Sequence, residues 1–424
     1  MLRRREPVLG ALLLARREWQ GRGVTLVNAD DVRSAAQILD GVVHTTPIQT
    51  SEAYSRLLGA SVVLKCEHLQ RTGSFKVRGA LVRLARLSEA ERAAGVVAAS
   101  AGNHAQGVAW SATRLGIAST VYMPSEAAIP KVEATRSYGA QVILGGANVQ
   151  EALERAVDEA GERTFVHPFD HADVVAGQGT VGLEILQQVP DVGTIVVPTG
   201  GGGLLAGIIA AVPPHVTVIG VQAERANGYP VSLEQGHPVL SVTHRTMADG
   251  IAVGLPGQVP FEVIAARGSR VVTVSEDDLS RAVLSLAERA KQVVEPAGAA
   301  GVAALVGGEL AGLIDPSRPV VVVLSGGNVD PIVLRKVFRH GMTAAGRYLH
   351  LRVLLSDRPG ALARLLTLVA DHGADVVTVA HVRTGVGLGV DETAVDLEVV
   401  TKGNAHGQDL LARLRDQGYH ALER

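Results

Sequence analysis

Short apolar runs alternate with segments of helical periodicity over residues 29–334. The runs are nearly continuous in Val, Ile and Leu, which is typical of strands buried on both faces of a parallel sheet. They lie at residues 62–64, 95–99, 120–123, 141–144, 194–197, 216–221 and 319–324. Alternation of such strands with helices predicts an α/β fold, with open, mostly parallel sheets that carry helices on both faces.

A different pattern begins near Tyr348. Apolar and polar positions alternate there, which predicts strands with one buried face, and helical spacing follows between the strands. The strands are expected at 349–355, about 376–382 and 395–399, and the helices carry Leu362, Leu365, Leu366 and Val369, then Leu410, Leu411 and Leu414. With a short last strand after Gly418, the order is βαββαβ, which predicts a ferredoxin-like domain.

These patterns divide the chain into a domain of two α/β lobes at 29–338, a linker at 339–347 and a C-terminal domain at 348–424. Residues 1–28 fit neither pattern. Their apolar run 8–15 follows three arginines and superficially resembles a signal peptide, but it is short and no cleavage site is clear. We expect a poorly ordered extension, or a natural start further along the chain.

Composition narrows the class of protein. The chain has 424 residues, 47% hydrophobic and 19% charged, which exceeds one hydrophobic core and is not disordered. The net charge of −2 gives no reason to expect nucleic acid or an anionic membrane as a partner. No apolar stretch has the length of a membrane-spanning helix. The single cysteine, Cys66, implies no disulfide and is interpreted as a packed thiol rather than a nucleophile, so we expect a cytoplasmic protein.

A run of four glycines, Gly200, Gly201, Gly202 and Gly203, follows a predicted strand and precedes an apolar helix that starts at Leu204. Backbone N–H groups of such a loop, together with the helix N-terminus, can bind a phosphate. A dinucleotide fingerprint, with Glu224 as the ribose-binding acid, also fits this segment. The loop alone therefore leaves a dinucleotide, another phosphate cofactor and a structural turn open.

Lys76 stands at a likely helix start, among the small and aromatic residues of Thr72–Ala80. Burial and a helix N-terminus would both lower its pKa, as a Schiff-base lysine requires. Two further loops follow predicted strands, Ser100–Gln106 and Ser325–Asn328. Because open α/β sheets bind ligands at the carboxyl ends of their strands, we expect these loops and Lys76 to converge, with backbone N–H groups of the first loop facing a substrate carboxylate.

Together these residues resemble the fold-type-II pyridoxal-phosphate enzymes, and among them the threonine/serine dehydratases. The resemblance spans residues 29–334 and rests on four segments: Gly73–Ala80, Ser100–Gly107, Gly177–Thr180 and Gly200–Leu204. It implies a fold like that of the tryptophan synthase β subunit, with pyridoxal phosphate as cofactor.

The resemblance also implies roles for single residues. Lys76 holds the cofactor covalently and is catalytic, as is Ser325, which contacts the pyridine nitrogen. Asn103 contacts the pyridine hydroxyl, Phe75 packs beside the ring, and Gly200 to Leu204 hold the phosphate. Substrate is expected at the first loop: Ser100, Ala101, Gly102, Asn103 and His104.

The implied reaction is the dehydration and deamination of threonine, and of serine, to an oxo acid and ammonia. Alternatives are a serine-preferring dehydratase, a serine racemase of the same family, a catalytically idle amino-acid-binding regulator, and a nicotinamide dehydrogenase, which leaves Lys76 and Ser325 without purpose. Ala101 stands where the racemases resembled here have a serine that shuttles a proton.

No metal site is expected. His104, His167 and His171 match no standard zinc spacing and are interpreted as structural. The racemases bind a metal through acids where Gln222 and Gly228 stand in this chain, although Glu224 lies nearby.

Residues 348–424 resemble an ACT domain, mainly through the turn Asp357–Leu362. Such domains pair side by side and bind small amino acids near this turn. The resemblance implies an amino-acid effector at Asp357 and Gly360, where glycine lets a ligand approach the backbone, and a homodimer or homotetramer. A domain that only supports oligomerisation is the alternative.

Overall fold

The computed structural model describes residues 26–383 and 388–423, so most of the extension expected at 1–28 lies outside the described residues. The chain divides between Pro331 and Ile332 into two compact units. Helix α15 (Pro331–Ala344) begins at this division and includes the first part of the stretch 339–347 that was predicted as a linker.

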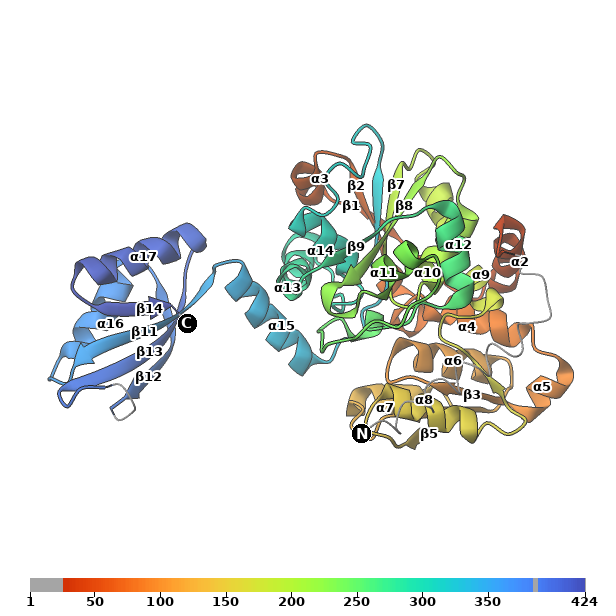
Figure 1. Ribbon diagram of the computed structural model, residues 1–424, viewed down its shortest axis with the longest axis horizontal. Coiled ribbons are helices and arrows are strands. Elements are labelled where there is room, and N and C mark those ends of the chain that lie inside the picture. Colours follow the sequence, from red (N-terminus) through yellow and green to blue (C-terminus); the bar gives the residue numbers. More distant parts are fainter. Residues whose placement is uncertain (1–25, 384–387, 424) are drawn as a thin grey trace. The chain divides into compact units, whose positions relative to one another are not determined.

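The first unit is built on two sheets, each with helices on both sides (Figure 1). The larger has the order β1-β2-β10-β7-β8-β9 and is parallel except for β1. Its strands are β1 (Ile48–Thr50), β2 (Val62–Lys65), β7 (Thr194–Pro198), β8 (Thr217–Ala223), β9 (Val271–Val274) and β10 (Val320–Val323). The four interior strands β2, β10, β7 and β8 are almost wholly buried, as their continuous apolar sequence predicts.

The smaller sheet has the order β5-β4-β3-β6 and is parallel throughout. Its strands are β3 (Val96–Ala99), β4 (Ser119–Met123), β5 (Gln141–Leu144) and β6 (Thr164–Phe165). The two sheets give the first unit two α/β lobes, and the predicted α/β class is confirmed.

Helices of both lobes connect these strands. They are α2 (Ala29–Leu39), α3 (Glu52–Leu58), α4 (Lys76–Ala85), α5 (Glu89–Ala94), α6 (Asn103–Arg114), α7 (Ile129–Ser137), α8 (Val149–Asp158), α9 (Ala172–Gln188), α10 (Gly203–Ala211), α11 (Gly228–Gln235), α12 (Gln258–Arg267), α13 (Glu276–Ser285) and α14 (Ala300–Gly307). Short turns of helix are η1 (Glu67–Leu69), η2 (Arg71–Gly73), η3 (Glu224–Ala226), η4 (Asp249–Ile251) and η5 (Leu286–Ala290).

Two glycines of α9 let this helix contact the backbones of two other helices. A Cβ on Gly177 would lie 2.7 Å from the Cα of Gly79 in α4, and a Cβ on Gly179 would lie 2.5 Å from the carbonyl oxygen of Gly207 in α10. Both distances are too short for any side chain. The motif Gly177–Thr180 therefore fixes the spacing between α4, which begins with Lys76, and α10, which begins at the glycine run.

The second unit is an antiparallel sheet of order β12-β13-β11-β14 with two helices. Its elements are β11 (Tyr348–Ser356), α16 (Ala361–Asp371), β12 (Asp375–Val382), β13 (Glu392–Val400), α17 (Asn404–Asp416) and β14 (His420–Glu423). The alternate residues of β11 predicted to be buried share one core with apolar residues of α16 and α17. The predicted βαββαβ order is confirmed.

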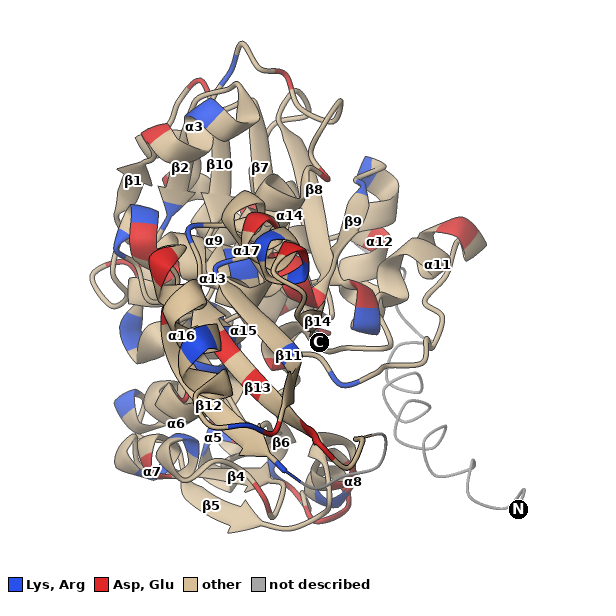
Figure 2. Ribbon diagram, turned by 90° about the vertical axis from the view of Figure 1, so that its left-hand side faces the viewer, with Lys and Arg blue, Asp and Glu red and all other residues tan. Residues whose placement is uncertain are grey.

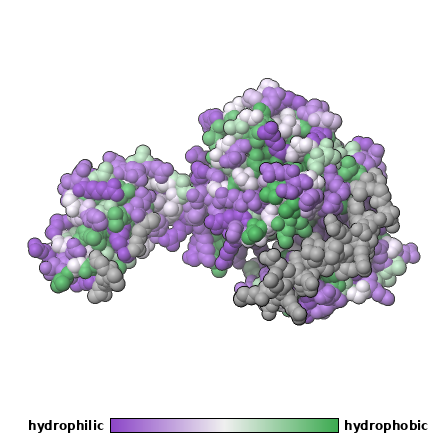
Figure 3. Space-filling model, in the orientation of Figure 1, coloured by the Kyte–Doolittle hydropathy of each residue, from purple (hydrophilic) through white to green (hydrophobic). Residues whose placement is uncertain are grey.

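The surfaces of both units are of mixed character. Basic and acidic residues are interspersed along the elements in Figure 2, and in Figure 3 hydrophobic patches lie among hydrophilic residues. Among residues 26–331, Val242 and Ile129 are the most exposed large hydrophobic residues, at 78% and 71%. None of the described helices combines the length and apolar character that crossing a membrane requires.

Candidate active site

Lys76 is placed by a segment that runs alongside the loop after β10. Ser74 forms an antiparallel bridge with Gly326, and the Phe75 N–H donates to the Ser325 carbonyl at 3.2 Å. Helix α4 then begins at Lys76. The structure therefore brings Lys76 together with the loop that follows β10 and contains Ser325, as the sequence analysis expected.

The amine of Lys76 lies among protein atoms. Its Nζ donates to the carbonyl oxygen of Pro168 at 2.9 Å and is 5.2 Å from the centre of the Phe75 ring. Desolvation lowers the pKa of Lys76 to about 8, against the opposing charge of Glu295. About a tenth of the amine is therefore neutral at pH 7, far more than for an ordinary lysine, and the neutral form is the one that attacks a carbonyl carbon or accepts a proton.

The glycine run forms the turn between β7 and α10. Protein groups hold its carbonyl oxygens: Gln222 Nε2 donates to Gly200 at 3.4 Å, and the Tyr229 hydroxyl donates to Gly201 at 3.1 Å. Within the described residues, no hydrogen bond engages the N–H groups of residues 200–204. Five successive unpaired donors at a helix N-terminus suit an anion such as a phosphate.

The backbone of this loop requires glycine. Gly202 has a φ of 97°, and a Cβ there would overlap the hydroxyl of Tyr229. A Cβ on Gly201 would overlap the Phe169 ring. Phe169 follows Pro168, whose carbonyl accepts from Lys76, so the lysine amine and the phosphate cradle lie on either side of this dipeptide.

Residues 100–104 lie between β3 and the first turn of α6. The N–H of Ser100 is bound to Tyr122, and the N–H of Gly102 is bound to the Ser100 hydroxyl at 3.1 Å. In the described chain, the N–H groups of Ala101, Asn103 and His104 have no partner. Of the N–H groups expected to face a substrate carboxylate, these three are therefore the ones that are unpaired in the described chain.

The side chain of His104 is occupied elsewhere. Its Nε2 is 2.8 Å from the carbonyl oxygen of Val166, and burial, followed by the charge of Lys76, lowers its pKa to about 3. The imidazole is neutral at physiological pH. Among residues 26–383 and 388–423, no group of three or more His, Cys, Asp or Glu side chains is placed to hold a metal ion.

Asn103 connects the first loop to an acid that the sequence analysis missed. Its Nδ2 donates to Glu295 Oε1 at 2.6 Å, and Gly326 lies against the same carboxyl group. Burial raises the pKa of Glu295 to about 7. Glu295 is the one charged residue in the apolar stretch 293–306, and this isolation was the available signal.

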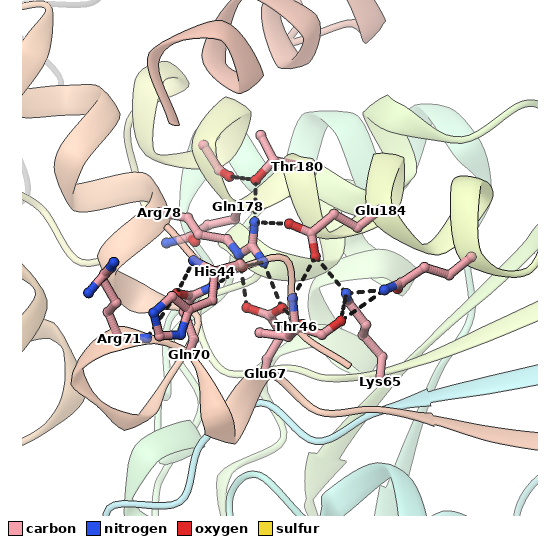
Figure 4. Close-up of polar contacts among 12 residues, drawn as sticks. His44, Thr46, Lys65, Glu67, Gln70, Arg71, Arg78, Gln178, Thr180 and Glu184 are labelled. Atoms are coloured by element: carbon pink, nitrogen blue, oxygen red, sulfur yellow. Dashed lines mark hydrogen bonds and ion pairs between the residues drawn. The ribbon is translucent and has the colours of Figure 1, made fainter. Parts of the chain in front are cut away.

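A buried ionic cluster lies beneath α4 (Figure 4). Arg78, two residues after Lys76, uses all five of its N–H donors, on both carboxylate oxygens of Glu67, on Glu184, on Thr180 and on the carbonyl of His44. Lys65 donates to Glu184 at 2.6 Å. The cluster joins α4 to η1, β2 and α9.

The site predicted in the second unit is an exposed turn. Gly360 has a φ of 82° and precedes α16, which explains the need for glycine there. Asp357 lies 3.7 Å from Arg383, and its N–H donates to the carbonyl of Asp391.

The residues of the first unit fit a cofactor that has a phosphate and an aldehyde. The unpaired N–H groups of residues 200–204 suit the phosphate, and the amine of Lys76 suits a carbonyl carbon. Ser325 is buried, and in the described chain its hydroxyl has no hydrogen-bond partner, which leaves it available to a ring nitrogen. This arrangement defines a class of α/β enzymes that hold pyridoxal phosphate at a buried lysine.

The chain belongs to the pyridoxal-phosphate-dependent enzyme family, whose model matches residues 39–326. The model of the ACT domain matches residues 350–416, so the second unit is an ACT domain. The chain is 46% identical over 382 residues to the L-threonine ammonia-lyase of Geobacter sulfurreducens, covering 89% of this chain and 94% of that protein.

Solved structures agree with this membership. The processed form of threonine deaminase isoform 2 from Solanum lycopersicum is 32% identical, with a TM-score of 0.69, over 74% of this chain and 95% of that one. Serine racemase from Dictyostelium discoideum is 34% identical, with a TM-score of 0.67, over 72% of this chain and 99% of that one.

Proposed function

We propose that this chain converts L-threonine to 2-oxobutanoate and ammonia with pyridoxal phosphate, and that L-serine yields pyruvate by the same route. One observation carries the proposal: the buried Lys76 amine donates to the carbonyl of Pro168, and the next residue, Phe169, packs against the glycine run with its five unpaired backbone donors. The identity to an L-threonine ammonia-lyase over 89% of the chain supports threonine as the substrate.

We assign the cofactor's phosphate to the N–H groups of residues 200–204 and its covalent attachment to Lys76. Phe75 packs beside the ring, Asn103 donates to the ring hydroxyl, and Ser325 contacts the ring nitrogen. A hydroxyl partner cannot hold a positive charge on that nitrogen as a carboxylate would.

Residues 100–104 would bind the substrate carboxylate through the N–H groups of Ala101, Asn103 and His104. When bound, the cofactor draws electrons away from the substrate α-carbon. The released amine of Lys76 accepts the α-proton at Nζ, for which its lowered pKa suits it. Loss of the α-proton and the β-hydroxyl together removes one water, and hydrolysis of the released enamine gives the oxo acid and ammonia.

Racemisation is the second candidate, because a serine racemase shares the fold and 34% of the residues. Removing and returning the proton on opposite faces requires a second acid–base group. Ala101 offers none in the substrate loop. We expect D-serine to form from L-serine far more slowly than pyruvate, and a chiral assay of the same reaction mixture tests this.

We further propose that the ACT domain binds a small amino acid at Asp357 and Gly360 and regulates the enzyme within a homodimer or homotetramer. A chain ending at Pro331, at the division between the units, should keep cofactor binding and turnover and lose any response to added amino acids. A folded truncation that no longer binds cofactor would show that the units are not separable.

The decisive test is the visible absorption of the purified protein with pyridoxal phosphate, before and after L-threonine, with 2-oxobutanoate assayed in the same cuvette. The cofactor band should shift on mixing while oxo acid accumulates, and Lys76→Ala should abolish both effects. A colourless, inactive protein in the presence of the cofactor would instead favour a catalytically idle amino-acid-binding regulator.

A further inference from the structure

Asn328 ends the loop after β10, and its side chain connects three segments of the site. Its Nδ2 donates to the carbonyl oxygen of Thr72 at 2.7 Å and to Asn103 Oδ1 at 2.7 Å. A side-chain amide has two N–H donors, so both are used. A Cβ on Gly73 would overlap the Asn328 amide, which shows how closely the amide packs against that backbone.

The first segment it holds is strained. Thr72 has φ 63° and ψ 12°, in the left-handed region that a β-branched residue rarely adopts. Such a conformation persists only where the surroundings enforce it. Asn328 holds the Thr72 carbonyl, and the Gly327 N–H donates to the Gly73 carbonyl at 2.9 Å. The strained turn lies four residues before Lys76 and directs the chain into α4.

The second segment is the start of α6. Because Asn328 presents an N–H, the oxygen of the Asn103 amide must face it, and the Asn103 nitrogen then faces Glu295. If the Asn103 amide were reversed, its nitrogen would face the Asn328 nitrogen, and two donors would oppose each other. Glu295 alone sets this orientation less firmly near neutral pH, since its carboxyl group can donate as well as accept when protonated and only accepts when ionised. Asn328 is a donor at any pH.

We propose that Asn328 is a positioning residue that fixes the amide of Asn103, so that its nitrogen serves the cofactor, and holds the strained turn that places Lys76. This rests on the proposed assignment of Asn103 and Lys76 to the cofactor. One hydrogen of the Asn103 nitrogen goes to Glu295, and the other remains for the cofactor's ring hydroxyl.

The test uses Asn328→Asp in the full chain, which keeps the shape and removes both donors. The dissociation constant of pyridoxal phosphate should rise roughly ten- to a hundredfold, as expected for loss of one or two hydrogen bonds to oriented groups. The balance between the absorption bands of the bound cofactor should shift as well, and should vary with pH near 7, where Glu295 loses its proton and can no longer donate. Asn148→Asp makes the same substitution at an exposed helix cap and should change neither.

Should Asn328→Asp not fold, Asn328→Ala in a Thr72→Gly background provides the second measurement. Glycine relieves the strain at residue 72, so this double variant should melt above Asn328→Ala alone and still show the altered cofactor bands. Wild-type affinity and bands in either folded variant would overturn the proposal while leaving the enzyme assignment intact. Lack of any cofactor band in the unmodified protein would overturn both.

Discussion

Replacing Arg78 with methionine should lower the free energy of unfolding of the first unit by about 3–5 kcal/mol, the usual loss when one partner of a buried ion pair is removed. Arg78 is 1% exposed and Glu67 is 0% exposed. Methionine fills the volume of the arginine stem but offers no donor. Since single domains are stable by about 5–15 kcal/mol, the loss is a large share of the total.

The size of this loss follows from the contacts of Glu67. Arg78 supplies two hydrogen bonds to this carboxylate, at 2.8 and 2.9 Å. In the variant, Glu67 keeps the Thr46 hydroxyl and the charge of Lys65. Adding about 1.5–3 kcal/mol for each charged hydrogen bond would overestimate the loss, because desolvation of the arginine itself is also removed.

The destabilisation should depend on pH. Burial alone raises the pKa of Glu67, but the charge and hydrogen bonds of Arg78 hold it below its ordinary value in the folded protein. Without Arg78, burial dominates and the folded-state pKa rises above the unfolded value. The folded variant then holds a proton that the unfolded chain releases, so the deficit should be larger at pH 8 than at pH 5.

Urea unfolding of the apoprotein, followed by tryptophan fluorescence, measures the effect. Trp110 lies in α6, so its fluorescence reports on the first unit. Arg33→Met is the control, because Arg33 and its partner Asp30 are 59% and 87% exposed, and it should leave the midpoint unchanged.

A midpoint of Arg78→Met close to that of Arg33→Met at pH 8 would refute the reasoning. A second check is the double variant Glu67→Gln/Arg78→Met. It removes the stranded carboxylate and should be more stable at pH 8 than Arg78→Met alone. Equal stability of the two would mean that lost packing, and not an unpaired charge, explains the deficit.

Two further predictions concern the cofactor site. Gly202→Ala should raise the dissociation constant of pyridoxal phosphate roughly tenfold or more, because a Cβ at a φ of 97° would overlap the Tyr229 hydroxyl; an absorbance titration measures it. Gly236→Ala, at a φ of 73° with open space around a Cβ, should leave the constant unchanged, and equal constants for both variants would contradict the steric argument. Glu295→Gln should stabilise the apoprotein at pH 8 by about 3 kcal/mol, because burial raises the folded-state pKa from 4.5 to about 7 and one unit corresponds to about 1.4 kcal/mol. The folded state holds a proton that the unfolded chain loses between these values, so the gain should shrink toward pH 5 in urea unfolding, and a gain independent of pH would disprove the raised pKa.

Much of the fold could be predicted because the strongest patterns were local. Buried strands such as β7 and β10 are continuous in apolar residues, and every second residue of β11 is buried. Of the strands that the sequence analysis does not name, β1 is an antiparallel edge strand of three residues and β6 has only two, whereas β9 is a four-residue run, largely of valine, at the other edge of the larger sheet. Their pairing depends on neighbours that are distant in the sequence.

The candidate site was predictable wherever one residue type has few alternative uses. A glycine run after a strand indicates a tight turn or a phosphate-binding loop, and a lysine among small residues at a helix start indicates a reactive amine. Glu295, Asn328 and Gln222 carry no such information, because their roles come from partners 192, 225 and 22 residues away. A polar residue in an apolar stretch indicates that a partner must exist, but its sequence does not say which.

The glycine run illustrates where sequence reasoning stops. Glycines allow the backbone of residues 200–203 to turn. Their conformational freedom does not decide whether N–H or carbonyl groups face the site. Gln222, Tyr229 and the backbone N–H of Gly257 bind the carbonyl oxygens of Gly200 and Gly201, and the N–H groups are left unpaired. The orientation of the loop therefore depends in part on two side chains from β8 and α11, and substitutions there should weaken phosphate binding without altering a single residue of the motif.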